Sequence, residues 1–223
     1  MLPSSTVENY LKAIYKGQLQ LGDDDRLVSM GLVAGALGVT PGTATTMIKA
    51  LAESGLARYE PYNGVRLSAA GETLAGRVLR RHRLVELFLV QVMGMSWAEV
   101  HEEAEHLEHA VSDRLIELID DMLGHPTTDP HGDPIPTVEG TLASRQLDSL
   151  LSCPVGTPLQ VTRVSDQDPT FLRFIGDHGL KPGQPVEVES RDPAADAVTL
   201  RAPGREPITI GARAASKLLV EPC

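Results

Sequence analysis

The chain has 223 residues, with 30 acidic and 20 basic side chains and a net charge of −10 at pH 7. A chain of this length exceeds the usual size of one domain, so we expect two or three modest hydrophobic cores. The longest apolar run, residues 84–95, is too short to cross a bilayer, and the first residues lack the features of a signal peptide. Cys153 and Cys223 have no metal-ligand spacing, so the sequence suggests neither a disulfide framework nor a zinc knuckle. We therefore expect a cytoplasmic protein with no membrane contact.

The acidic charge is concentrated in the middle of the chain. Residues 1–80 carry 8 Lys and Arg against 7 Asp and Glu, residues 81–140 carry 3 against 13, and residues 141–223 carry 9 against 10. A near-neutral N-terminal region does not exclude binding to nucleic acid. The gathered carboxylates and imidazoles indicate a cation site more than a solvated face. Six of the seven histidines lie in the acidic segment: His82, His101, His106, His109, His125 and His131.

Three helices are predicted near the N-terminus. Ser5 and Glu8 have the spacing of a capping box, which begins the first helix. The second covers about 29–37. The third begins at Thr40, an N-cap followed by proline at the first helical position, and stops at Gly55.

The outward face of the third helix is small and polar. Residues 57–68 read as two short strands joined by an Asn63–Gly64 turn, which completes the element order of a winged helix. A small polar helix face can approach base edges in the major groove, while nearby cations offer charge to phosphates. The alternative on pattern alone is a winged helix with a structural or protein-binding role. The predicted DNA contacts are Thr40, Gly42, Thr43, Thr45, Thr46, Lys49, Arg58 and Arg66.

Three further helices are expected in the middle region. A long one runs from Ser68 to about Val92, a capping box of Ser96 and Glu99 begins the next, and the last covers 112–123. Their amphipathic faces predict packing against one another and against a second copy of the chain. The segment 124–140 holds four Pro and three Gly and is expected to form a rigid connector.

From Cys153 onward the pattern changes to short β-rich runs. The segments PLQVTRV, PVEVESR, AVTLRA and EPITIGA read as strands, and PTFLRFIGDHG reads as a helix. They predict a small barrel of roughly five strands. The expected fold is mainly α, with a winged helix-turn-helix at 1–73, a helical domain at 74–140, a linker at 141–152 and the barrel at 153–223.

The acidic segment contains a candidate metal site. Buried carboxylates need a cation to offset their desolvation. His82 and Glu86 form an i, i+4 pair of ligand type on the long helix. The alternative is a charged, solvated helix face. On the next helix, at about 100° per residue, four ligand-type residues share one arc at the edge of the buried face: His101, Glu105, Glu108 and His109.

Two enzyme motifs fit less well. Residues 101–105 begin like the zinc-protease motif His-Glu-x-x-His but have Glu105 in place of the second histidine. Glu103 and His106 have di-iron carboxylate spacing, yet they face away from the ligand arc and have no second copy. A metal-dependent hydrolase or di-iron enzyme is the alternative function, and a metal-storage or scaffold protein is a third. Carboxylate and imidazole ligands without thiolate suit manganese or ferrous iron.

Five segments of the chain form a specific pattern: PSSTVENYLKAIY, residues 38–71, RRHRLVELFL, VHEEAEHLEHAVSD and HGDPIP. Together they resemble the diphtheria toxin repressor and manganese transport regulator family of metal-dependent bacterial transcription factors, over nearly the whole chain. The resemblance implies a C-terminal Src-homology-3-like barrel of the FeoA type. It also implies a homodimeric transcriptional regulator that binds a double-stranded DNA operator of metal-homeostasis genes when manganese, or ferrous iron as second choice, is bound; whether it represses or activates is left open.

The resemblance further implies two metal sites. The first would comprise Asn9, Glu105, Glu108 and His109. The second would comprise His82, Glu86 and His101, with Asp168 of the barrel as a further ligand.

Some positions depart from the family pattern. Asn9 stands where members commonly have Met or Asp, and Lys12 stands where some manganese members have a second acid. Glu105 stands where iron-type members carry cysteine, which favours manganese. Four histidines are expected to be structural or solvent-facing: His106, His125, His131 and His178.

Overall fold

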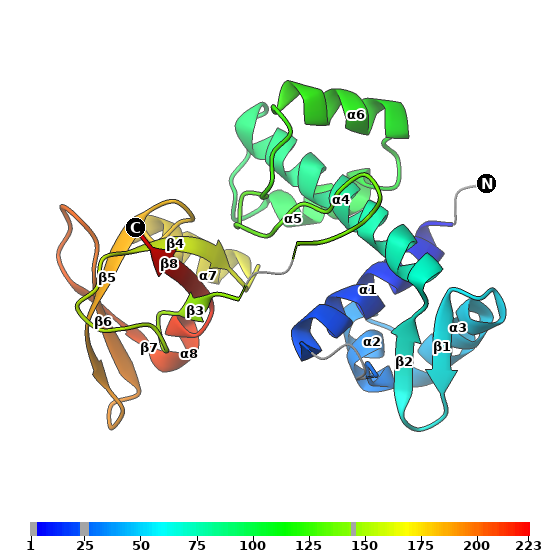
Figure 1. Cartoon of the computed structure of the whole chain (residues 1–223), viewed down its shortest axis with the longest axis horizontal. Helices are drawn as coiled ribbons and strands as arrows, with labels where there is room; N and C mark the ends of the chain where they lie inside the picture. The colour runs from blue at the N-terminus through cyan, green and yellow to red at the C-terminus, as the bar shows by residue number, and fades with distance from the viewer. Residues whose placement is uncertain (1–3, 23–26, 144–145) are drawn as a thin grey trace. The chain divides into compact units, whose positions relative to one another are not determined.

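The computed structural model describes residues 4–22, 27–143 and 146–223 (Figure 1). It divides into two compact units, one formed by residues 1–82 with 136–142 and the other by residues 83–135 with 143–223. The division falls within one long helix, α4 (Ala69–Gln91).

The first unit is the predicted winged helix. Its helices and its two-stranded sheet lie together in Figure 1 and share one hydrophobic core, in which Leu11 and Ile14 of the first helix are grouped with Ile48 and Leu51 of the third. Because α1 and α3 share this core, a shift of one would disturb the packing of the other. The elements are α1 (Ser5–Leu21), α2 (Met30–Leu37), α3 (Pro41–Glu53), β1 (Ala57–Glu60), β2 (Gly64–Leu67) and the first part of α4.

The N-caps of the first unit confirm the prediction for α3 and not for α1. Thr40 caps α3 through its hydroxyl group, as predicted, and Ser29 caps α2 in the same way. The predicted capping box of α1 is wrong, because Ser4 accepts the hydrogen bond from the Val7 backbone N–H. Glu8 cannot fold back to complete the box, because its buried carboxylate lies 3.5 Å from the Arg81 guanidinium of α4.

The hairpin turn also differs from the prediction. Glu60 pairs with Gly64, so the loop consists of residues 61–63 and Gly64 belongs to β2. Gly64 has φ +141°, and a Cβ atom there would lie 2.4 Å from the carbonyl oxygen of Val28. The glycine is therefore required by close packing against Val28, which bridges to Val65 of β2, and not by a two-residue turn.

The helical part of the second unit contains the rest of α4, α5 (Val100–Leu107) and α6 (Asp113–Met122). Their apolar residues form a second hydrophobic core. The predicted capping box at Ser96 and Glu99 is wrong. The Ser96 hydroxyl accepts from the Ala98 N–H in a turn of its own, and Glu99 caps α5 without a side-chain hydrogen bond. Since α5 ends at Leu107, residues 108–110 lie in the turn that follows it.

The C-terminal part of the second unit is an antiparallel sheet around a third core. Its strand order is β3-β8-β4-β5-β6-β7. The four predicted strands are present, and the prediction missed the two-residue β3 and the terminal β8. The elements are β3 (Asp148–Ser149), β4 (Leu159–Val164), α7 (Pro169–Asp177), β5 (Pro185–Asp192), β6 (Ala197–Arg201), β7 (Ile208–Gly211), α8 (Ala212–Ala215) and β8 (Leu218–Pro222).

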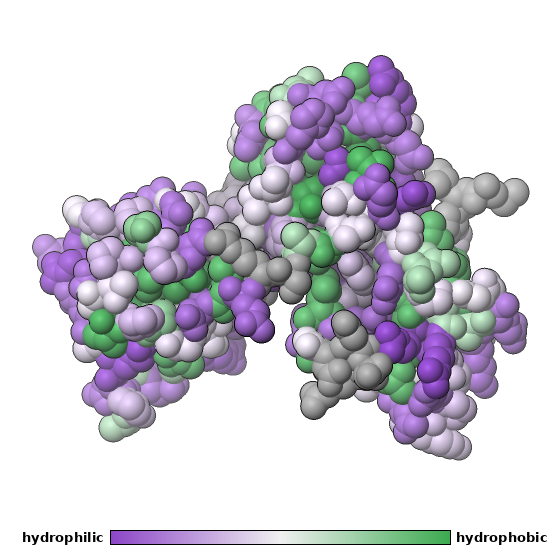
Figure 2. All heavy atoms as spheres, viewed as in Figure 1, coloured by the Kyte–Doolittle hydropathy of each residue, from purple (hydrophilic) through white to green (hydrophobic). Residues whose placement is uncertain are grey.

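No single helix among the described residues has the length and apolar character to cross a membrane. Only the bent pair α2 and α3 meets that test when taken together. On the face seen in Figure 2, hydrophilic side chains are spread over all parts of the chain.

Candidate metal centre and DNA-binding surface

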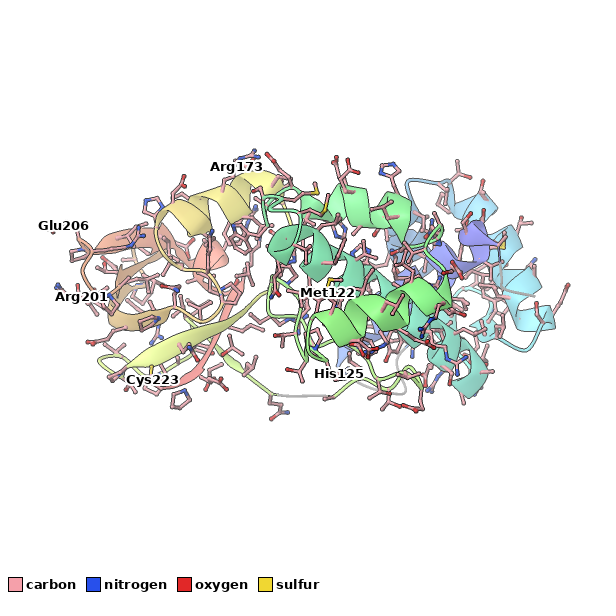
Figure 3. The ribbon with its side chains drawn as sticks, turned by 90° about the horizontal axis from the view of Figure 1, so that it is seen from above. Met122, His125, Arg173, Arg201, Glu206 and Cys223 are labelled. Atoms are coloured by element: carbon pink, nitrogen blue, oxygen red, sulfur yellow. The ribbon has the colours of Figure 1, made fainter. Side chains whose placement is uncertain are left out.

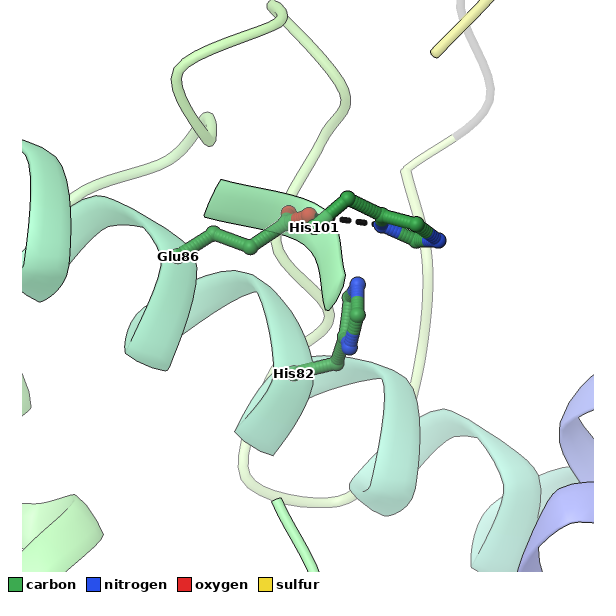
Figure 4. Close-up of side chains that lie close together, drawn as sticks. All are labelled: His82, Glu86 and His101. Atoms are coloured by element: carbon green, nitrogen blue, oxygen red, sulfur yellow. Dashed lines mark hydrogen bonds and ion pairs between the residues drawn. The ribbon is translucent and has the colours of Figure 1, made fainter. Parts of the chain in front are cut away.

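Helices α4 and α5 bring together His82, Glu86 and His101 (Figure 4). His82 and Glu86 lie one turn apart on α4, and His101 comes from the first turn of α5. The Nδ1 atom of His101 lies 2.9 Å from Oε1 of Glu86. One ligand atom of each residue lies within 4.8 Å of the others, and both α4 residues are buried. Two imidazoles and a carboxylate at this spacing could hold one divalent cation.

A second group consists of His82, Glu105 and Glu108, whose ligand atoms also lie within 4.8 Å of one another. Glu108 is fully buried although it follows the end of α5, and Oε1 of this residue lies 3.1 Å from Nε2 of His109. Nε2 of His101 lies 3.5 Å from Oε1 of Glu105. The two groups therefore share His82 and are connected through the His101–Glu105 pair.

Asn9 and Asp168 are the two remaining residues of the predicted ligand sets. Asn9 lies on α1 in the first unit, where the ion pair between the neighbouring Glu8 and Arg81 joins α1 to α4. Asp168 is the N-cap of α7, and its Oδ1 accepts a hydrogen bond of 2.9 Å from the Phe171 N–H. Asp168 belongs to none of the ligand groups found among the described residues.

A third group, Glu86, Asp129 and His131, was not predicted as a site. All three side chains are buried. The backbone N–H groups of His131 and Asp133 donate to Oδ1 of Asp129 at 2.8 and 2.9 Å. The ring of His131 is fixed by a 2.8 Å hydrogen bond between Nε2 and the Trp97 carbonyl oxygen. Residues 129–134 alternate Asp and His with Pro and Gly and have no helical or strand period of apolar residues, so no spacing in the sequence points to a site there.

The electrostatics of this third group favour a cation. Burial raises the pKa of Asp129 well above its ordinary value, and the nearby Asp133 and Glu86 carboxylates raise it further. Burial also lowers the pKa of His131, which favours the neutral, ligating imidazole. A bound divalent cation would attract the ionised carboxylates and so offset the free-energy cost of burying their charge.

Arg83 of α4 partly offsets the same negative charge. Its Nε lies 3.6 Å from Oδ2 of Asp129, and its NH2 group lies 3.6 Å from Oδ1 of Asp133. It also donates to the carbonyl oxygen of Pro134. From the sheet, Arg163 of β4 pairs with Asp133. The connector loop is thus held between α4 and β4 by charge-assisted contacts.

The other histidines are in more exposed places. His125, beyond α6 (Figure 3), lies 2.9 Å from Asp120 and 3.8 Å from Asp121, and this fourth group is largely exposed. His106 is exposed on α5, and Nδ1 of His178 donates to the Phe174 carbonyl oxygen at 2.7 Å.

The outward face of α3 carries the residues predicted to contact DNA. The side chains of Thr43, Thr46 and Lys49 are exposed, whereas Thr45 is half-buried. The hydroxyls of Thr45 and Thr46 donate to the carbonyl oxygens of Pro41 and Gly42 at 2.7 and 3.1 Å. Because both hydroxyl protons are used in these bonds, the two threonines can offer only methyl groups and hydroxyl lone pairs to DNA.

Two arginines face each other across the hairpin. Arg58 of β1 pairs in register with Arg66 of β2, so both side chains leave the same face of the sheet. Arg58 is largely exposed and lies 2.9 Å from Glu60. Like charges directly opposite each other are unfavourable, so this face is suited to an anionic partner.

Three family models match consecutive parts of this chain. Residues 3–65 match the iron dependent repressor N-terminal DNA binding domain, and residues 68–137 match the iron dependent repressor metal binding and dimerisation domain. Residues 149–222 match the FeoA domain. The chain belongs to the iron-dependent repressor family. Members of this family are metal-dependent transcriptional repressors and not enzymes, so the hydrolase and di-iron alternatives find no support.

The similarity to other repressors of this family extends over the full length. The chain is 30% identical to the iron-dependent repressor IdeR of Mycobacterium leprae (strain TN), over 97% of this chain and 96% of the relative. It is 37% identical to the solved structure of a manganese-dependent transcriptional repressor in complex with manganese, with TM-score 0.87 and coverage of 97% and 100%. The structure of the manganese regulator SloR is 30% identical, with TM-score 0.76 and full coverage of both chains.

Proposed function

We propose that this repressor responds to manganese and that metal binding favours operator binding by the dimer, so that it controls genes of metal-ion homeostasis in the cytoplasm. The observation that carries the proposal is the burial of Glu86 and Glu108 beside imidazoles. Fully buried carboxylates are costly unless a cation or a proton neutralises them. We assign the functional parts to residues 1–73, 74–140 and 153–223, joined by 141–152.

The choice of metal rests on ligand chemistry. The groups on α4, α5 and the connector offer carboxylate oxygens and imidazole nitrogens. Within the described chain, neither cysteine belongs to such a group, since Cys153 lies in the sheet core and Cys223 is exposed. Hard oxygen and imidazole ligands suit manganese, with ferrous iron as the second choice. Similar structures have been solved with manganese, zinc or cadmium, so sites of this kind hold more than one divalent metal.

The coupling between metal and DNA is proposed to run through α1. A cation bound by Asn9, Glu105, Glu108 and His109 would connect α1 to α5. Since α1 shares its hydrophobic core with α3, fixing α1 also limits the positions of the recognition helix. Bound metal would thus reduce the conformational entropy that the two winged helices of a dimer lose when they bind the operator.

The dimer surface is proposed to include α6. Its residues Leu115, Leu118 and Met122 are exposed apolar side chains spaced three and four apart, of which Met122 is labelled in Figure 3. Apolar residues at this spacing form one stripe of a helix. A second copy of the chain would cover the stripe in a two-fold symmetric contact.

A DNA-binding titration tests the proposal. The full-length protein is titrated into a duplex enriched from a random-sequence pool by the manganese-loaded protein, with manganese, ferrous iron, zinc or chelator present. We expect tight binding with manganese and loss of binding with chelator. Binding that is equal in chelator, or enrichment of no duplex, would remove the proposed switch.

A further inference from the structure

The tip of the wing, the loop of residues 61–63 between β1 and β2, carries one aromatic side chain that does not pack against the rest of its unit. Tyr62 lies between β1 and β2 and is fully exposed. The other three tyrosines of the chain belong to the core of the first unit: Tyr10 is buried, and Tyr15 and Tyr59 pack against it. Burial therefore does not explain an aromatic residue at position 62.

The backbone at Tyr62 is also unfavourable for this residue type. Tyr62 has φ +66°, in the left-handed region that residues with a side chain seldom adopt. The Asn63 N–H donates to the Glu60 carbonyl oxygen at 3.1 Å, which closes a turn with Pro61 and Tyr62 as its central residues. Proline followed by a positive φ is the pattern of a type II turn, in which glycine or asparagine is preferred at the second position. A tyrosine thus occupies a position where neither packing nor turn chemistry favours it.

The surroundings of Tyr62 identify the kind of partner. Arg58 and Arg66 leave the same face of the hairpin and stand directly opposite each other, and together with Glu60, 2.9 Å from Arg58, they leave the two strands with a net positive charge. An exposed ring at the tip of such a hairpin suits the edge of a nucleic-acid duplex, where the ring packs on a sugar and the cations meet phosphates. Backbone strain at an exposed residue is the pattern expected of a functional site.

We propose that Tyr62 is a DNA-contacting residue of the wing, whose ring packs against the sugar edge of the groove next to the one that receives α3. This inference rests on the proposed DNA-binding function. The ring contact is uncharged, so it adds affinity without counterion release. It differs in this way from the contacts expected of Arg58 and Lys49.

The substitution Tyr62→Asn separates this role from a structural one. Asparagine tolerates the positive φ of the turn, so the midpoint of thermal unfolding should equal or exceed that of the wild type. The affinity of the manganese-loaded, full-length protein for the enriched duplex should fall roughly fivefold to tenfold, because the ring is lost. The slope of log affinity against log salt should stay unchanged, since no charge is removed.

Two further variants make the test specific. Tyr62→Phe keeps the ring and should bind within about twofold of the wild type, because the sugar contact does not need the hydroxyl. Tyr59→Phe, on the same hairpin but packed on the core, should bind as the wild type does. Wild-type affinity in Tyr62→Asn, or a lower unfolding midpoint in that variant, would overturn the proposal. A wild-type protein that enriches no duplex with manganese would instead remove the DNA-binding function itself.

Discussion

Nε2 of His131 lies 2.8 Å from the backbone carbonyl oxygen of Trp97. A carbonyl can only accept, so Nε2 carries the proton and Nδ1 is left with its lone pair on the side of Asp129, 4.0 Å from Oδ1. A backbone carbonyl that fixes the tautomer of a histidine in this way is a common support for metal ligation. The α4–α5 turn, where Trp97 lies, thus orients a side chain of the connector loop.

The first prediction concerns this histidine. His131→Ala should weaken manganese binding at the group that includes Glu86 and Asp129 by at least about tenfold, because one of three ligands is lost. Calorimetric titration of the full-length protein measures the change. His106→Ala is the matched control, since His106 is exposed and belongs to none of the groups found in the described chain. Identical isotherms for His131→Ala and the wild type would show that His131 has only a structural role.

The second prediction concerns pH and metal removal. The pKa of Asp129 is raised by burial and by the Asp133 and Glu86 carboxylates. A carboxyl group with a raised pKa in the folded state stabilises the metal-free protein at low pH, and this stabilisation is lost as pH rises through that pKa. A bound cation favours the ionised form instead. The gain in thermal-unfolding midpoint that manganese provides over chelator should therefore increase with pH between 5 and 8, as scanning calorimetry can measure.

A manganese-induced gain that is constant with pH, or that decreases as pH rises, would mean that no buried carboxylate ionises on binding. Asp129→Asn should flatten the dependence, because its amide does not titrate.

The sequence predicted features within a single helix better than contacts between residues that are far apart in the chain. His82 and Glu86 could be paired from i, i+4 spacing, and Thr40 could be recognised as a cap because both are properties of one helix. The end of α5 was misplaced, since the ligand pattern continues past Leu107 while the helix does not. Asp129 and His131 were missed because a connector rich in Pro and Gly has no period, so its approach to Glu86 depends on tertiary packing.

The third prediction separates charge from sequence reading at the DNA surface. Lys49→Ala and Arg58→Ala should each weaken binding to all duplexes and reduce the salt slope by about one, because each removes one phosphate contact. Thr46→Val should instead change the preferred sequence, because it removes the acceptor oxygen and keeps a methyl group. Salt titrations and a new round of duplex selection measure the two effects. If Lys49→Ala and Arg58→Ala kept both the affinity and the slope, another surface would contact DNA.

The last prediction concerns the coupling itself. Glu108→Gln should abolish metal-dependent DNA binding and leave the fold intact, because a neutral amide replaces a buried carboxylate next to His82 and His109. Glu103→Gln, exposed on α5 just before Glu108 in the chain, is the matched control. Circular dichroism and sedimentation of both variants would show whether the folded dimer survives.

Linkage makes this prediction quantitative. The operator must tighten manganese binding by the same factor by which manganese tightens operator binding, a coupling on the order of 1 to 3 kcal/mol. Because His82 belongs to the group that contains Glu105 and Glu108, and Glu86 does not, His82→Ala should reduce this factor more than Glu86→Ala, and less than Glu108→Gln. Calorimetry with and without the duplex measures the factor for each variant. Equal manganese affinity in both conditions for the wild type would mean that the metal stabilises the repressor without switching it, and the role of Glu108 would then be confined to holding the metal.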